Sequence, residues 1–147
     1  MTRTRLFGAL VFIPLLLTPS FAHHLAVVVN KNNPMGEVSS AHLAKIFQSE
    51  IKKWPDGKDV VVVLHRSSNG EKVTLERLNR MSATQIETLI TTHVGSIVLV
   101  DSDSDVLNTV ETNPGAIGLV EVHSIDDHVK VIKVDGKLPL EDGYLPH

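Results

Sequence analysis

The chain has 147 residues and a slightly acidic composition, with 14 lysines and arginines against 17 aspartates and glutamates and no cysteine. The absence of cysteine excludes disulfide bonds, thiol catalysis and cysteine-ligated metal sites. An acidic chain without a basic cluster lacks the positive surface that binds nucleic-acid backbones, so we expect no nucleic-acid partner.

Residues 1–22 have the layout of a secretory signal peptide. Two arginines precede an apolar stretch at residues 6–17, and small residues follow at Ser20 and Ala22. A helix needs about 20 apolar residues to span a bilayer, which is more than this stretch contains. We therefore predict cleavage after Ala22, a single mature domain of residues 23–147 and a periplasmic or secreted location.

In chain order, the first predicted element is a buried strand at residues 25–29, which are all apolar and mostly β-branched. A helix follows, capped by Ser39 or Ser40, with apolar residues at i, i+3 and i+4 spacing. Turn-forming residues then lead into a second apolar strand at residues 60–64. Trp54, the only tryptophan, lies between this helix and strand, and we expect it to pack its loop against the domain.

The next two predicted elements are both helices. After a polar loop that begins at Arg66, an irregular apolar stripe predicts a helix over residues 73–81. Ser82 and Gln85 have the spacing of a capping box, which indicates that a further helix begins at Ala83. This second helix should end near the next glycine of the chain.

The remaining elements return to the alternation of strand and helix. Residues 97–100 are short and apolar, which favours a strand. Asp103 or Ser104 can cap the helix that follows, and a proline–glycine pair ends it. Two further apolar runs, at residues 116–122 and 129–134, are interpreted as the last strands.

Apolar strands without alternation, separated by helices, indicate an α/β fold with a mostly parallel sheet that is covered on both faces. In such sheets, ligands bind beyond the carboxyl ends of the strands. The sequence shows no repeat and no obvious linker. The tail at residues 137–147 has two prolines and little periodicity, so we expect it to be loosely ordered.

A candidate anion-binding site lies in the loop after the strand at residues 60–64. It consists of Arg66, Ser67, Ser68, Asn69 and Gly70. These residues supply a guanidinium, small hydrogen-bond donors and a pliable backbone at the start of a helix, an arrangement that suits an anion. The alternative is an ordinary solvated loop arginine. The loop lacks the spacing of a Walker motif, so nucleotide hydrolysis is not indicated.

The sequence contains no constellation that indicates catalysis. His65 precedes two serines closely, but a nucleophilic triad is defined by geometry and not by adjacency in the sequence. Asp101, Asp103 and Asp105 alternate as in a calcium loop, yet Val106 stands where an EF-hand requires glycine. The three acids fit the start of a helix, whose dipole they complement. We therefore predict that the chain is not an enzyme.

The histidines of the chain suggest one candidate metal site, at the predicted mature N-terminus. His23 and His24 would begin the mature chain, where an α-amine and an imidazole can chelate copper. The other histidines lack metal-binding spacing and are interpreted as scattered surface or loop residues. No cofactor is therefore predicted, and copper binding at the N-terminus stays an open alternative.

Several ordered motifs of the chain resemble the phosphate-binding subunit of ABC importers, the PstS family. The motifs are LAKIF at residues 43–47, IKKW at 51–54, VVVLHRS at 61–67 and NPGAIGLVE at 113–121. In that family, a helix ending in Ile-Phe, an Ile-X-X-Trp loop, a strand leading into Arg-Ser and a Pro-Gly-Ala-Ile-Gly segment occur in the same order. The resemblance spans about residues 25–122.

The resemblance implies one lobe of a type 2 periplasmic-binding-protein-like fold, because full-size family members have two lobes with phosphate between them. It also implies an exported solute-binding-like protein that binds phosphate or another small oxyanion, weakly or together with a partner. The partner would be an ABC permease, another envelope protein or a second copy of the chain. A homodimer of this kind would rebuild a two-lobed cleft.

The chain departs from the family pattern inside the candidate loop. Ser68 stands in place of the family's aspartate, Asn69 in place of a glycine, and residues 70–72 (GEK) in place of Ser-Gly-Thr. These exchanges remove hydroxyl donors and leave an alternative function. The chain would then be a non-transport interaction domain of the cell envelope that keeps the fold and has lost the ligand site.

Overall fold

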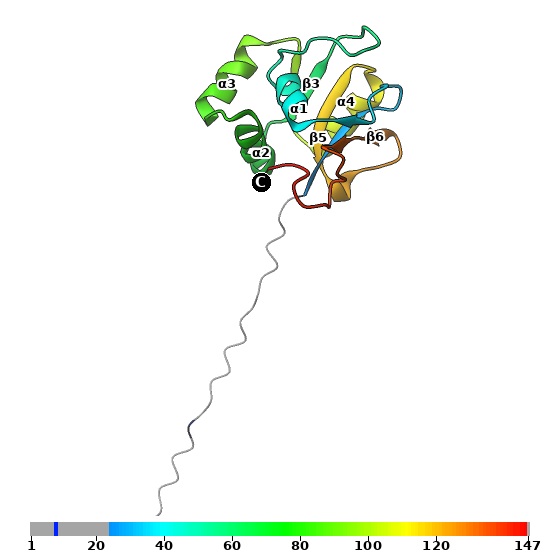
Figure 1. Cartoon of the computed structure of the whole chain (residues 1–147). Coiled ribbons are helices and arrows are strands. Elements are labelled where there is room, and N and C mark those ends of the chain that lie inside the picture. The colour runs from blue at the N-terminus through cyan, green and yellow to red at the C-terminus, as the bar shows by residue number, and fades with distance from the viewer. Residues whose placement is uncertain (1–7, 9–23, 147) are drawn as a thin grey trace, which may run out of the picture.

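The structure is a computed structural model that describes Gly8 and residues 24–146. The predicted signal peptide (apart from Gly8) and the predicted mature N-terminus, His23, lie outside the described residues. Figure 1 shows a central sheet with helices packed around it. No helix in the described part of the chain is long and apolar enough to cross a membrane.

Five strands form the central sheet in the order β4-β3-β5-β1-β6. They are β1 (Leu25–Asn30), β3 (Val61–His65), β4 (Ile97–Val100), β5 (Ala116–Glu121) and β6 (Val129–Val131). β3 pairs in parallel with both β4 and β5, whereas β1 runs antiparallel to both β5 and β6. Four strands therefore point one way and β1 points the other, which confirms the predicted, mostly parallel sheet.

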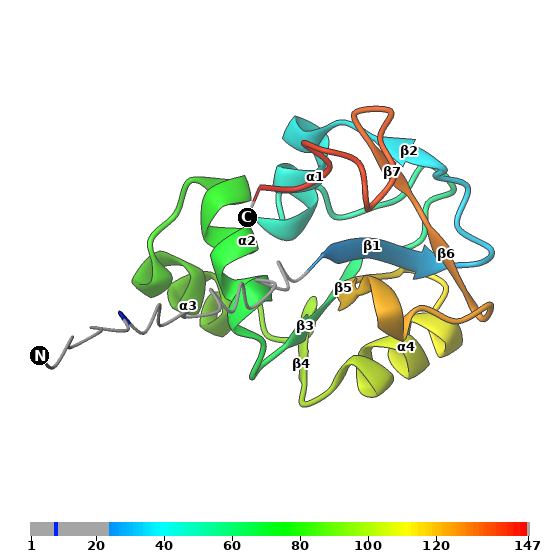
Figure 2. The same cartoon turned by 90° about the horizontal axis from the view of Figure 1, so that it is seen from below.

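Helices cover both faces of this sheet: α1 (Ser40–Phe47), α2 (Asn69–Asn79), α3 (Ala83–Thr92) and α4 (Asp103–Thr112). The first three contribute side chains to one hydrophobic core, and α4 contributes to a second core. Figure 2 shows α1 and α4 on opposite sides of β1. The predicted α/β fold with helices on both faces is thereby confirmed.

The continuous apolar run in β1 follows from the position of this strand in the sheet. Val27 and Val29 are buried in the core that contains α1, whereas Val28 is buried in the core that contains α4. Successive side chains of a strand point to opposite faces, so a strand that is covered on both sides is apolar at every position.

A serine side chain caps the N-terminus of each of the four described α-helices, and one of the predicted caps was wrong. The predicted caps at Ser39 and in the Ser82 capping box are confirmed. For α4 we expected Asp103 or Ser104, but Ser102 accepts the capping hydrogen bond. The backbone of Ser102 is extended and Asp103 is already helical, so the Asp103 carboxylate is available for contacts with other elements.

Helix α2 differs from the apolar stripe that predicted it. It begins at Asn69 and ends before Met81, the last residue of the stripe. Val73, which the stripe assigned to the core, is exposed. The buried face of α2 is largely polar because it carries Glu71, Thr74 and Asn79 beside Leu75. The periodicity of the apolar residues therefore predicted both the start and the buried face of this helix incorrectly.

The predicted strand at residues 129–134 is divided between two sheets. β6 belongs to the central sheet, whereas β7 (Lys133–Val134) pairs in parallel with β2 (Glu37–Val38) in a separate two-stranded sheet. Neither the division nor β2 was predicted. The strand expected at residues 116–122 is β5, which ends at Glu121 where a short 3-10 helix, η1 (Val122–Ser124), begins.

The C-terminal tail is packed against the domain, contrary to the loose order expected for it. Tyr144 and Leu145 are buried in the core that contains α1. The phenol of Tyr144 donates to the carbonyl of Ile132 at 2.7 Å and accepts from the N–H of Val27 at 3.1 Å. A single aromatic side chain with two hydrogen bonds therefore ties the tail to the sheet despite the two prolines.

Trp54 packs its loop against the domain, as predicted. Its indole is buried, and Nε1 donates to the carbonyl of Gly115 at 2.9 Å. The same carbonyl accepts from the N–H of Val61 at 2.9 Å. A Cβ on Gly115 would lie 1.9 Å from the carbonyl oxygen of Asp59, so only glycine permits this close approach.

Candidate functional site

An open hollow of about 450 Å³ lies at the carboxyl ends of β3, β4 and β5. Its lining residues come from the end of each strand and from the starts of α2 and α4: His65, Ser67, Ser68, Asn69, Gly70, Asp101, Ser102, Asp103 and Glu121. Helix N-termini carry unpaired N–H groups and the positive end of the helix dipole. Two such termini at one hollow form an arrangement that attracts anions.

Four of the five predicted site residues line this hollow. The Oγ atom of Ser68 accepts from the N–H of Glu71 at 3.2 Å and thereby caps α2. Asn69 and Gly70 are the first two residues of that helix, and Ser67 is exposed just before it. The structure therefore brings these residues together, while their use as anion ligands stays a prediction.

Arg66, the fifth predicted residue, is not among the residues that line the hollow. Its N–H donates to the carbonyl of Val100 at 2.8 Å and continues the pairing of β3 with β4. Arg66 lies in the turn that follows β3, and it lines a different depression, between α2 and α3. It is exposed, with Nε at 3.7 Å from Oδ1 of Asp101. The position of Arg66 next to Ser67 in the sequence therefore did not indicate that Arg66 lies outside the lining of the hollow.

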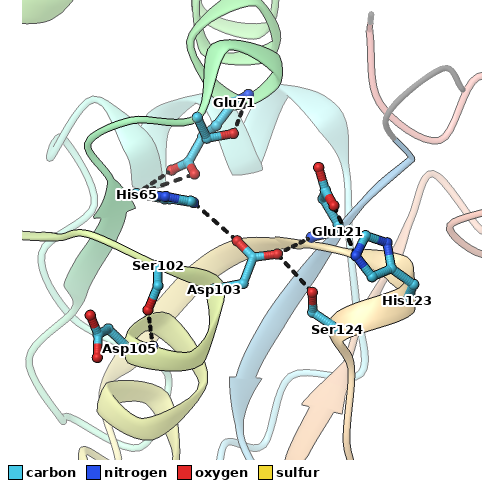
Figure 3. Close-up of polar contacts among 9 residues, drawn as sticks. His65, Glu71, Ser102, Asp103, Asp105, Glu121, His123 and Ser124 are labelled. Atoms are coloured by element: carbon cyan, nitrogen blue, oxygen red, sulfur yellow. Dashed lines mark hydrogen bonds and ion pairs between the residues drawn. The ribbon is translucent and has the colours of Figure 1, made fainter.

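Asp103 connects three elements at the floor of the hollow (Figure 3). Its Oδ1 lies 3.1 Å from Nδ1 of His65, at the end of β3. Its Oδ2 accepts from the N–H of Glu121 at 3.0 Å and from Oγ of Ser124 at 2.9 Å. A carboxylate of the chain itself therefore occupies hydrogen-bond donors at the ends of β3 and β5.

Glu71 is the one buried carboxyl group next to the hollow among the described residues. Both of its carboxyl oxygens accept from the N–H of His65, at 3.2 and 3.3 Å. Burial raises the pKa of Glu71 to about 8, an effect that the hydrogen bond from His65 opposes and the charge of Asp103 reinforces. A pKa raised in this way favours the protonated form of Glu71 at neutral pH. The acid beside the predicted loop is therefore largely uncharged.

The charges that line the hollow are acidic. Asp101, Asp103 and Glu121 border it, and no lysine or arginine does so among the residues that the structure describes. Oε2 of Glu121 lies 3.0 Å from Nε2 of His123, which offsets its charge when the imidazole is protonated. The hollow thus combines backbone and hydroxyl donors with carboxylates, which weakens the attraction of an anion.

Asp101, Ser102, Asp103 and Glu121 were not identified as site residues from the sequence. Each follows or ends a strand, β4 or β5, that flanks β3 in the sheet. The sequence did contain one signal for these residues: they lie at the ends of strands that neighbour β3. The carboxyl ends of neighbouring parallel strands meet at one edge of a sheet. Sequence reasoning assigned the acids only to the start of a helix, where Asp103 and Asp105 do lie in the first turn of α4.

Metal binding has no support in the described part of the chain. Residues 24–146 contain no group of three or more histidine, cysteine, aspartate or glutamate side chains that could hold a metal ion. The copper alternative requires His23, which lies outside the described residues, so it stays untested.

The chain belongs to the PBP superfamily, because the model of the PBP superfamily domain matches residues 7–142. Among curated proteins, the phosphate-binding protein PstS of Bacillus subtilis (strain 168) is 29% identical over 120 residues, which are 78% of this chain and 37% of that protein. The predicted resemblance to the PstS family is thereby confirmed.

Solved structures agree with this assignment. An ABC-type phosphate transport receptor from Vibrio cholerae superposes with a TM-score of 0.65 at 25% identity, over 79% of this chain and 48% of the receptor. A putative phosphate ABC transporter substrate-binding protein with bound phosphate from Clostridium perfringens has the same TM-score at 23% identity, over 79% and 46% of the two chains, and supports the fold. By their names, these relatives are phosphate-binding and phosphate-transport proteins. This chain spans less than half the length of each relative.

Proposed function

We propose that the chain is an exported solute-binding-like protein of the PstS type, which binds phosphate or another small oxyanion in the hollow. The observation that carries the proposal is the meeting of two helix N-termini, those of α2 and α4, at the carboxyl ends of β3 and β4. The ligands would be the backbone N–H groups and side chains of Ser67, Ser68, Asn69 and Gly70. The relatives that are phosphate-binding proteins support phosphate as the oxyanion.

The binding would be weak in the isolated chain or would require a partner. Carboxylates border the hollow and, among the described residues, no lysine or arginine lines it, so the oxyanion meets donors without a neutralising cation in its lining. A partner would close the open side of the hollow and supply positive charge. We propose an ABC permease, another envelope protein or a second copy of the chain in this role, in the periplasm or outside the cell.

Calorimetric titration of residues 23–147 with phosphate and with sulfate at low ionic strength tests the proposal. We expect dissociation constants around the millimolar level, which correspond to about −4 kcal/mol. Ser67→Asp adds a negative charge at the hollow and should weaken binding at least tenfold. Thr84→Asp adds the same charge at the start of α3, away from the hollow, and should leave binding within twofold. No saturable heat with either anion, or equal losses in both variants, would refute oxyanion binding at this site.

The second candidate function is a non-transport interaction domain of the cell envelope. The observation that favours it is the Asp103 carboxylate, which accepts the hydrogen bonds of Glu121 and Ser124 that an external anion would otherwise receive. Absence of oxyanion binding, together with affinity capture of an envelope protein that is not an importer permease, would support this candidate. Capture of a permease would support the first.

Cleavage after Ala22 has its own test. Mass spectrometry of the protein from the periplasm or culture medium should give a chain that begins at His23. A protein that retains residues 1–22 would overturn the proposed processing.

A further inference from the structure

A second depression, which we call the α2–α3 groove, lies between these two helices and the edge of the sheet. Its volume is about 420 Å³, and aliphatic side chains from α2, α3, β3 and β4 line it: Leu64, Leu75, Ile86, Ile90 and Leu99. Small-molecule sites typically measure about 300–1,000 Å³ and combine an apolar lining with a few polar groups at defined positions. The groove has the size and lining of such a site.

Polar groups gather at one end of the groove, where β3 ends and α2 begins. Arg66 follows β3 directly, and Lys72 lies in the first turn of α2, near the positive end of the helix dipole. The contact of Arg66 with Asp101 is exposed and long, and such pairs hold a guanidinium only weakly. Both cations are therefore available to a ligand at this end of the groove.

Glu71 adds a buried carboxyl group to the same end. It lines the groove, is 2% exposed, and accepts both of its described hydrogen bonds from the N–H of His65. A protonated carboxyl also carries an O–H donor, which none of the described hydrogen bonds uses. In the protonated state, this O–H is a donor from which a ligand carboxylate at this end of the groove can accept a hydrogen bond.

Two acids besides Glu71 also line the groove. Glu76 follows Lys72 by one turn of α2, and Glu87 projects from α3. The groove has a cationic, donor-bearing end and an apolar body. This distribution selects a molecule with an anionic head and an apolar tail, and it disfavours a small inorganic anion, which would leave the aliphatic lining exposed to water.

We propose that the α2–α3 groove binds an amphiphilic monocarboxylate, with its alkyl chain on the leucine and isoleucine side chains and its carboxylate at Arg66, Lys72 and the Glu71 carboxyl. The ligand class and the surface both differ from those of the phosphate proposal. Arg66 and Glu71 line the groove and not the hollow, so either site can fail without the other.

An NMR titration of the ¹⁵N-labelled chain of residues 23–147 with decanoate tests this proposal. The amide signals of Ile86, Ile90 and Leu99 should shift and saturate, while those of Ser67 and Asn69 should respond to phosphate instead. Each buried methylene contributes up to about a fourfold gain in affinity, so hexanoate should bind at least tenfold more weakly than decanoate. Decyltrimethylammonium, which has the same tail and the opposite charge, should bind at least tenfold more weakly than decanoate.

Two variants and two matched controls locate the site. Lys72→Glu and Ile90→Asp should each weaken decanoate binding at least tenfold. Lys31→Glu and Val94→Asp make the same changes at exposed positions that do not line the groove, and should leave binding within twofold. A dispersed amide spectrum confirms that each variant is folded.

Three results would overturn the proposal. The first is a titration with decanoate that does not saturate, and the second is equal affinity for the cationic amphiphile. The third is a set of shifts at Ile86, Ile90 and Leu99 that depends on protein concentration without ligand, which would assign the groove to a second copy of the chain.

Discussion

Oδ1 of Asp103 lies 3.1 Å from Nδ1 of His65 and joins the start of α4 to the end of β3. The other carboxylate oxygen accepts hydrogen bonds from the end of β5 and from η1. One side chain therefore organises the floor of the hollow and also places a negative charge there.

Replacement of Asp103 by asparagine separates these two effects. The variant loses charge-assisted hydrogen bonds, so the free energy of unfolding should fall by about 1–3 kcal/mol in urea titrations. Removal of a repelling charge should tighten phosphate binding about three- to tenfold in calorimetry at low salt. Asp105→Asn removes the same charge from the first turn of α4 without touching the hollow, and should change neither quantity by as much. Unchanged or weaker phosphate binding in Asp103→Asn would contradict the electrostatic account.

The stability of the protein should depend on pH through Glu71. Its pKa is about 8 in the folded chain against 4.5 ordinarily, so the folded state binds more protons than the unfolded state between these values. The stabilising contribution is complete below pH 4.5 and is lost as the pH rises to 8, with a maximum of about 5 kcal/mol. Glu71→Gln cannot ionise and should lack this loss.

Urea unfolding at pH 5 and pH 8.5 measures the effect as a difference between the two proteins. The wild type should lose several kcal/mol more than Glu71→Gln over this interval. Glu87→Gln, which changes an exposed carboxylate, should follow the wild type. Parallel pH profiles of wild type and Glu71→Gln would show that Glu71 is not a buried, protonated acid.

Tyr144 should contribute strongly to stability although it lies near the C-terminus. Tyr144→Phe keeps the ring and leaves the N–H of Val27 and the carbonyl of Ile132 without the phenol, which should cost about 1–3 kcal/mol. Amide hydrogen exchange should accelerate at Val27 in particular. Leu140→Ala alters an exposed side chain of the same tail and should have little effect. Equal stability of Tyr144→Phe and wild type would indicate that the tail is not fixed by these bonds.

Gly118 of β5 permits the close approach of α4. A Cβ at this position would lie 2.6 Å from Cγ1 of Val106 and 3.3 Å from the carbonyl oxygen of Val63. Gly118→Ala should therefore lower the free energy of unfolding by about 1–3 kcal/mol. In the Val106→Ala background the clash is relieved, so the additional cost of Gly118→Ala should shrink. Gly36→Ala, where a Cβ meets nothing within 4 Å, is the control.

The parts of the fold that were predicted correctly are those that depend on short stretches of sequence. The strand at residues 25–29 followed from a continuous apolar run, and α3 followed from the Ser82 and Gln85 capping box. Hydrogen bonds and periodicity of this kind connect residues only a few positions apart. Helix α2 was predicted less well because its buried face is polar, and its burial depends on contacts with α1 and the sheet.

The candidate site was predicted only in part for the same reason. Ser67, Ser68, Asn69 and Gly70 form one loop, and their meeting at the start of a helix could be inferred from the sequence. No short stretch of the sequence indicated that Asp101, which follows β4, and Glu121, which ends β5, would line the same hollow.

The sequence by itself determined the α/β class, the positions of most helices and strands, and the resemblance to the PstS family, since each depends on local patterns of residues. Only the tertiary structure decided that Arg66 does not line the hollow, which acids border it, and that Glu71 is buried with a raised pKa. These properties arise from the strand order β4-β3-β5 and from burial, and both are set by contacts between residues far apart in the chain.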